Sequence, residues 1–194
     1  MTQTTNGRVS PPRPALLLLL ALVGPLSGCA TTARAPALAL SAEAVAGIPV
    51  PPALKHNIII GKVSGGQDTH ALWMSKVGND DFARALHDSL AAANLLATGP
   101  NAGQYVLVAD LQRLRQPAFG TKLQVTAVVD YSLKERASGE TALQTQVVTP
   151  YTAGLGDAFL GGERLKVASA GAIRSNIERL IRELAENFNG TNTP

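Results

Sequence analysis

The sequence predicts an α+β fold, a two-layer sandwich in which a mostly antiparallel sheet of about four strands carries two helices on one face. The elements follow in the order β-α-β-β-β-α, each is apolar on one side only, and short turns join the last three strands. Helices packed on one face of such a sheet cover every apolar stripe at once. Residues 56–189 therefore form a single α+β domain of ordinary size.

The first strand and helix are predicted from composition and from end signals. Residues 56–63 are a β-branched run followed by glycines, a pattern typical of a buried strand. Asn79 is expected to cap a helix that ends near Asn94, and Asp80 and Asp81 in its first turn favour the helix dipole. The apolar stripe of this helix consists of Phe82, Leu86, Leu90 and Ala93.

Three further strands are predicted over residues 105–114, 122–134 and about 143–149, because apolar and polar side chains alternate there. The alternation is clearest in the middle strand, where one face carries Leu123, Val125, Ala127, Val129, Tyr131 and Leu133. We therefore expect an antiparallel meander with one buried and one wet face. A right-handed crossover through the first helix would make the first two strands parallel.

A long helix from about Glu163 to Asn189 is expected to close the domain, and residues 190–194 are expected to be a disordered tail. The apolar stripe of this helix consists of Leu165, Ala168, Ala172, Ile173, Ile177, Leu180, Leu184 and Phe188. Arginines and glutamates alternate on its other side, as on a solvent-facing helix surface.

The N-terminus has the pattern of a secretory signal over residues 1–28. A polar segment with two arginines and no acids precedes nine consecutive apolar residues, Ala15 to Val23, which Gly24-Pro25 interrupts. Nine helical residues extend over about 13 Å, against roughly 30 Å of hydrocarbon, so this segment is too short to span a membrane. The alternatives are an uncleaved hydrophobic N-terminus or a chance cysteine after the signal.

The residues Leu26, Ser27, Gly28 and Cys29 end this segment and resemble the lipobox of bacterial lipoproteins. The resemblance implies that Cys29, the single cysteine of the chain, receives a diacylglyceryl thioether, that cleavage occurs before it, and that its new amine is acylated. Two or more acyl chains give stable membrane anchoring. Ala30 in place of Asp implies the outer membrane by the sorting rule of enterobacterial lipoproteins, with the domain facing the periplasm.

Residues 29–55 are rich in Ala, Pro and Thr without clear periodicity, which predicts a lipidated tether of extended backbone. The alternative is a partly ordered arm packed on the domain, which Ile48 and Val50 would permit.

The charge of the chain is nearly balanced. Once the signal with Arg8 and Arg13 is removed, the chain has 15 basic and 14 acidic residues. This near-balance argues against nucleic-acid binding, which needs a concentrated basic surface.

No motif of the sequence predicts catalysis, a metal or a cofactor, and we expect a non-catalytic protein. His56, His70 and His87 have no His, Cys or Glu at the spacing of metal ligands. The G-x-S-x-G elbow of common hydrolases is absent from the sequence, although a catalytic triad could still assemble in space.

Aromatic side chains in three loops suggest an interaction surface. In the expected topology, Trp73, Phe119 and Phe159, with Leu160 beside the last, lie at one end of the sheet. Exposed aromatic patches often mark interaction sites, so these residues are candidates for a partner-binding rim. The alternative is that each ring folds back to cap the core.

Beyond the lipobox, Leu72-Trp73-Met74-Ser75-Lys76-Val77 and the junction from Phe159 to Leu165 resemble small, uncharacterised proteobacterial envelope lipoproteins. The element order is more loosely similar to periplasmic accessory lipoproteins of envelope transport and assembly machines. These resemblances imply an adaptor that binds an envelope protein. A lipid- or glycan-processing enzyme and a carrier of small apolar ligands are the alternatives. Some relatives are labelled UDP-N-acetylglucosamine acyltransferases, but this chain has neither tandem hexapeptide repeats nor an H-x-x-x-x-D motif.

Overall fold

A computed structural model describes residues 1–2, 38–66, 77–99, 102–116 and 123–190, and it has the α+β fold that the sequence predicts. The helices are α1 (Ala42–Val45), α2 (Asn79–Ala92) and α3 (Gly161–Gly190), with a short 3-10 turn at Pro52–Leu54. The strands are β1 (Ile58–Ser64), β2 (Tyr105–Arg115), β3 (Leu123–Glu135) and β4 (Thr141–Ala153). The third helix, α1, was not among the predicted elements.

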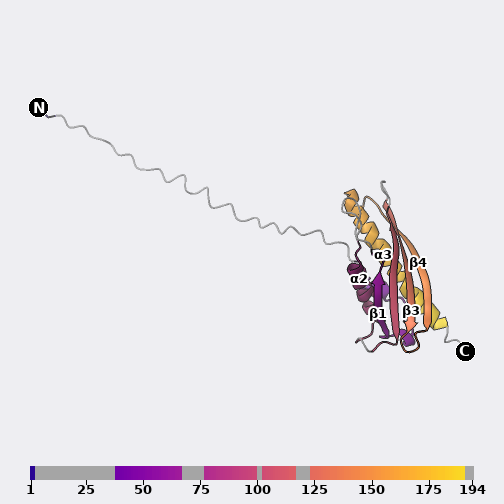
Figure 1. Cartoon of the computed structure of the whole chain (residues 1–194). Coiled ribbons are helices and arrows are strands. Elements are labelled where there is room, and N and C mark those ends of the chain that lie inside the picture. Colours follow the sequence, from indigo (N-terminus) through magenta and orange to yellow (C-terminus); the bar gives the residue numbers. More distant parts are fainter. Residues whose placement is uncertain (3–37, 67–76, 100–101, 117–122, 191–194) are drawn as a thin grey trace. The chain divides into compact units, whose positions relative to one another are not determined.

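The four strands form one open, mixed sheet in the order β1-β2-β3-β4. β1 and β2 are parallel, and the pairs β2–β3 and β3–β4 are antiparallel, which confirms the expected meander. Helix α3 packs along β3 and β4, and α2 packs beside β1, so the helices form the second layer on one face (Figure 1). The opposite face of the sheet is the open face.

The core lies between these two layers and contains the predicted apolar stripes. All six predicted inward residues of β3 are buried, as are Phe82, Leu86 and Leu90 of α2. In α3, the predicted stripe from Leu165 to Leu184 is buried, and Phe188 at its end is partly buried with its ring edge-on to Tyr105. The alternation of the sequence therefore identified the buried face of each long element.

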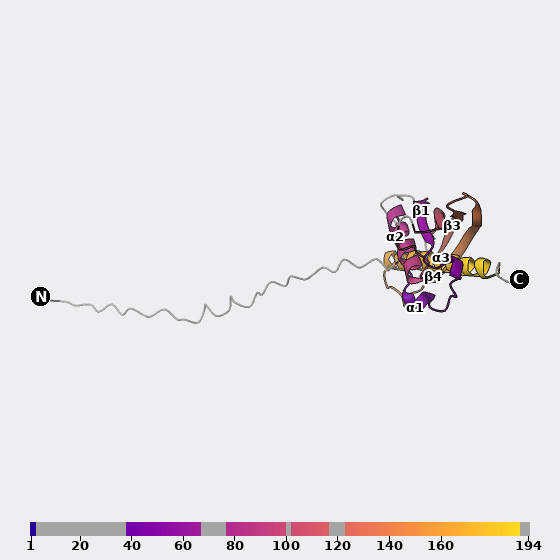
Figure 2. The ribbon, with the colours of Figure 1, turned by 90° about the horizontal axis from the view of Figure 1, so that it is seen from below.

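Residues 38–55 of the expected tether pack on the domain, which is the alternative that the sequence left open. Leu40, Val45, Ile48 and Leu54 are buried in the domain core. The Leu40 amide donates a 2.9 Å hydrogen bond to Ser89 Oγ, and α1 packs against α2 (Figure 2). Residues 38–55 therefore belong to the domain and do not form an extended linker, because their apolar side chains are buried there.

Two local expectations need correction. Gly78, not Asn79, is the N-cap of α2, and Asn79 Oδ1 instead accepts a 2.7 Å hydrogen bond from the Gly66 amide. The Asn79 side chain thus joins the end of β1 to the start of α2. The last strand is also longer than the predicted 143–149, since Thr141 at its start and the residues from Pro150 to Ala153 at its end also pair with β3.

A β-bulge at Gln112 reverses which side chains at the end of β2 point to the core and which to the open face. Leu111 pairs with Val129, whereas Arg113 pairs with Val128, so Gln112 is the extra residue. A bulge reverses the alternation beyond it. Leu114 therefore packs against the core, and Arg113 and Arg115 lie on the open face.

A buried polar network connects α3 to the sheet. Tyr131 Oη donates a 2.9 Å hydrogen bond to Asn176 Oδ1, and Asn176 Nδ2 donates to Val147 O at 2.9 Å and to Thr149 Oγ1 at 3.1 Å. Thr149 Oγ1 in turn donates to Ala172 O at 3.1 Å. Because buried polar groups need fixed partners, these bonds determine where α3 sits along β3 and β4.

Candidate functional site: an apolar loop and a cationic concavity

Most residues of the predicted sites lie outside the described part of the chain. These are the lipobox with Cys29, the rim residues Trp73 and Phe119, and the expected tail after Gly190. Phe159 and Leu160 are described, in the segment between β4 and α3. The site is therefore built from that segment and from the open face of the sheet.

The segment Gly154–Leu160, here called the apolar loop, carries three large side chains that project into solvent. Phe159 is 88% exposed, Leu160 66% and Leu155 62%. Phe159 thus points away from the core and does not cap it. Exposed apolar side chains are ordinary when scattered singly, but a group of three on one short loop is typical of a contact surface.

The apolar loop is held at both ends by hydrogen bonds. The Gly154 amide donates to Asp157 Oδ2 at 2.8 Å, which closes a turn after β4. At the other end Arg164 is only 8% exposed, and its Nη1 donates to Phe159 O at 3.2 Å. The Arg164 amide also donates to Leu160 O at 3.0 Å, which begins the bonding of α3. A buried arginine therefore fixes the backbone that presents Phe159.

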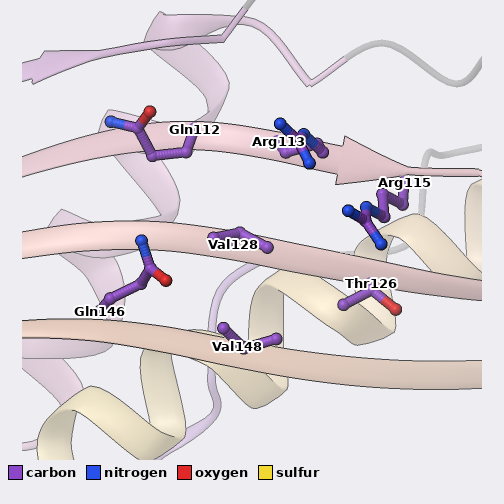
Figure 3. A pocket seen from close by; sticks show the side chains of 7 residues that line it. All are labelled: Gln112, Arg113, Arg115, Thr126, Val128, Gln146 and Val148. Atoms are coloured by element: carbon purple, nitrogen blue, oxygen red, sulfur yellow. The ribbon is translucent and has the colours of Figure 1, made fainter.

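The open face of the sheet carries a second candidate, a shallow concavity of about 430 Å³. Its side chains come from β2, β3 and β4 and lie on the side of the sheet away from α3 (Figure 3). The lining residues are Gln112, Arg113, Arg115, Thr126, Val128, Gln146 and Val148. It therefore combines two cations, polar groups and an apolar floor.

The residues of this concavity lie in neighbouring rows across the sheet. Arg113 pairs with Val128 and Val128 pairs with Val148, so one row runs from a cation to two apolar side chains. In the next row Arg115 pairs with Thr126. Val148 is 54% exposed, although it lies in the middle of a strand. The two cations of the concavity thus lie on β2, and its two apolar side chains lie on β3 and β4.

The nearby carboxylates are engaged by other side chains. Asp110 and Asp130 pair across β2 and β3 in the row before Arg113. Asp110 accepts hydrogen bonds from Ser64 Oγ at 2.9 Å and Gln112 Nε2 at 2.6 Å, and Asp130 accepts one from Gln146 Nε2 at 2.8 Å. Among the ion pairs of the described residues, none includes Arg113 or Arg115.

The described residues bring together no His-based catalytic group. Ser64 and Asp110 are bonded on the sheet, whereas His87 is exposed on α2 beside Asp88 and His56 precedes β1. Across the described ranges, His, Cys, Asp and Glu form no group of three that could hold a metal ion. Within those same ranges, every helix is too short or too polar to cross a membrane.

Comparisons with known proteins give the fold. No protein-family model matches the chain, and no curated protein sequence matches it significantly. A crystal structure of a Xanthomonas campestris protein of the family DUF330 is similar, with a TM-score of 0.58, 9% identity and coverage of 74% of this chain and 91% of that one. A candidate lipoprotein from Caulobacter crescentus has a TM-score of 0.51 and 16% identity, with coverage of 71% and 94%. Both share the fold.

Sequence reasoning missed the concavity because its residues come from three strands and because a bulge turns two of them outward. One signal was present in the sequence. The alternation that puts Leu107, Ala109 and Leu111 inside would put Arg113 inside as well, and a lone arginine is a poor core residue. A break of this kind predicts a bulge, although it does not say what the outward arginines would face.

Proposed function

We propose that this chain is a non-catalytic lipoprotein of the bacterial cell envelope that acts as an adaptor by binding another envelope protein. The similarity in fold to a DUF330 protein and to a candidate lipoprotein supports the lipoprotein and envelope part of this proposal. The lipobox supports Cys29 as the acylated residue. Ala30 after it supports an anchor in the outer membrane, with the domain in the periplasm.

The observation that carries the adaptor function is the apolar loop. Its three large side chains are exposed, while the rest of the described domain keeps its large apolar groups packed, apart from Val148 and the terminal Met1. Aromatic side chains such as Phe159 are enriched in protein interfaces, and the two exposed leucines beside it add apolar contact area. Because Arg164 and Asp157 hold the backbone, presenting Phe159 to a partner requires little ordering of the loop.

A lipid anchor would make such a loop effective at modest affinity. Acyl chains on Cys29 would confine the domain to a membrane surface and raise its effective concentration beside a partner in the same compartment.

Crosslinking in intact cells tests the adaptor function. A photo-crosslinking amino acid in place of Leu155 is expected to capture an envelope protein. The double variant Phe159→Ala, Leu160→Ala should lose most of this capture without a lower melting temperature, because both side chains are exposed. Glu140→Ala with Thr141→Ala, an adjacent exposed pair at the start of β4, is the matched control and should keep the capture. Capture of no protein, or equal loss in the control, would contradict the proposal.

Metabolic labelling with an alkyne fatty acid tests the anchor separately. The wild-type chain is expected to take up the label and the Cys29→Ser variant is not. An unlabelled wild-type chain would refute the anchor and leave the partner experiment unaffected.

A further inference from the structure

We infer that the concavity on the open face binds the anionic phosphate headgroup of a lipid, at Arg113 and Arg115. This site lies on β2, β3 and β4 and is separate from the apolar loop. The inference therefore does not depend on the adaptor function, and either can fail alone.

The sheet presents two cations side by side on its open face. Arg113 and Arg115 are two residues apart and share a face, and the bulge at Gln112 turns both of them to the open face. Side chains at this spacing in a strand are about 6.6 Å apart at their origins, within reach of one anion. Bulges are often found where a strand must re-aim a side chain at a binding site.

No carboxylate is among the described side chains that line the concavity. Asp110 and Asp130, in the neighbouring row, are bonded to Ser64 and to two glutamines and do not line the concavity. Two guanidinium groups thus face the same hollow without a carboxylate partner among the described residues. The planar fork of each guanidinium matches phosphate oxygens, and the Thr126 hydroxyl can donate a further bond.

The two valines of the concavity favour a lipid as the source of the phosphate. Val128 and Val148 extend from Arg113 across the sheet, and Val148 is exposed although it is apolar. A free phosphate ion would leave these side chains in water, whereas the glycerol and first acyl carbons of a lipid would cover them. A volume of about 430 Å³ fits a headgroup and not a whole lipid.

Calorimetric titration of the chain, as isolated from the cell envelope in a non-ionic detergent, tests this site. The probes are dihexanoyl-phosphatidylglycerol, dihexanoyl-phosphatidylcholine and inorganic phosphate. We expect the anionic lipid to bind at least about tenfold more tightly than the zwitterionic one. Both lipids carry the phosphodiester, but the two arginines repel the quaternary ammonium that phosphatidylcholine also carries. Equal affinity for the two lipids would overturn the inference.

The variants locate the site. Arg113→Gln with Arg115→Gln should lower the affinity for the anionic lipid to that for the zwitterionic lipid. Arg179→Gln with Arg182→Gln removes the same charge from exposed positions on α3 and should leave the affinity unchanged. An equal loss in both double variants would show a general charge effect and overturn the site. Arg113→Lys with Arg115→Lys keeps the charge and should bind at an intermediate level.

A substitution at Val148 distinguishes a lipid headgroup from a free phosphate ion. Val148→Ser should weaken the anionic lipid severalfold and leave binding of inorganic phosphate unchanged. If inorganic phosphate binds as tightly as the lipid and Val148→Ser affects neither, the lipid assignment is wrong.

Discussion

Asn176 shows how a single residue can determine the packing of a whole element. It is fully buried in α3, and its side-chain amide joins Tyr131 of β3 to Val147 and Thr149 of β4. An apolar residue at this position would leave a buried hydroxyl and a backbone carbonyl without partners, which costs about 1–3 kcal/mol for each group. The sequence shows this asparagine only as an interruption of an apolar stripe.

Tyr131, the donor in this network, gives a pH-dependent prediction. Its burial raises the pKa of the hydroxyl well above the ordinary value of 10.0. The unfolded chain therefore loses this proton at a pH where the folded chain keeps it. Stability is unaffected below pH 10 and falls above it, by up to about 1.4 kcal/mol per pH unit.

Urea denaturation between pH 8 and pH 11.5 measures this effect. Tyr131→Phe should be less stable than the wild type at pH 8, because Asn176 Oδ1 loses its donor. The two stability curves should then converge above pH 10, since the variant has no hydroxyl to ionise at this position. Parallel curves over the whole range would show that Tyr131 is not kept neutral by burial.

At the scale of elements, α3 contains a glycine in its middle that the sequence does not explain. The ring of Tyr151 from β4 lies against Gly171, and a Cβ at Gly171 would come much closer to three ring carbons than van der Waals contact allows. Gly171 thus lets helix and sheet approach closely at this point. Glycine usually weakens a helix interior, but here the close packing of the Tyr151 ring compensates for that cost.

Gly171→Ala is therefore expected to lower the free energy of unfolding, whereas the same change at an open helical site raises it. It should destabilise the domain by about 1–3 kcal/mol, as overpacking does. In a Tyr151→Ala background the change should become neutral or stabilise by up to about 1 kcal/mol, because the ring is gone. Gly162→Ala, at a position of α3 with no atom near the added Cβ, is the control. Chemical denaturation of the four variants measures the cycle, and an equal effect of Gly171→Ala in both backgrounds would contradict it.

At the scale of the whole molecule, residues 38–55 extend the domain beyond the boundary that composition predicts. Proline and alanine enrichment resembles a linker, yet the apolar residues within it are buried in the core. A truncation starting at residue 56 would remove Leu40, Val45, Ile48 and Leu54 from that core.

Leu54→Ala tests this boundary. Leu54 is fully buried, so the substitution should destabilise the domain by about 2–5 kcal/mol. Lys55→Ala, at the exposed position beside it, should change stability by less than about 0.5 kcal/mol. Thermal or urea denaturation of the full chain distinguishes them. Equal stability of both variants with the wild type would mean that the arm is not part of the cooperative fold.

The fold class, the strand order and the buried face of each long element were predictable because alternation and helical spacing report burial directly. The same patterns cannot report local exceptions. Asn79 is not the cap because its side chain accepts a hydrogen bond from Gly66 at the end of β1, and the bulge at Gln112 depends on the pairing of β2 with β3. The packed arm was left open as an alternative, since Ile48 and Val50 show apolarity and not the surface that receives it.

The sequence by itself determined that this chain folds as helices on one face of a meander. The periodicity of its apolar residues shows which side of each helix and strand must be buried. The sequence also singled out Phe159 and Leu160, but not whether they face the core or solvent. Only the tertiary structure decided that they project, because Arg164 folds back on the loop backbone. It alone assembled the two arginines and two valines of the concavity, since neighbours across strands are set by register and not by distance along the chain.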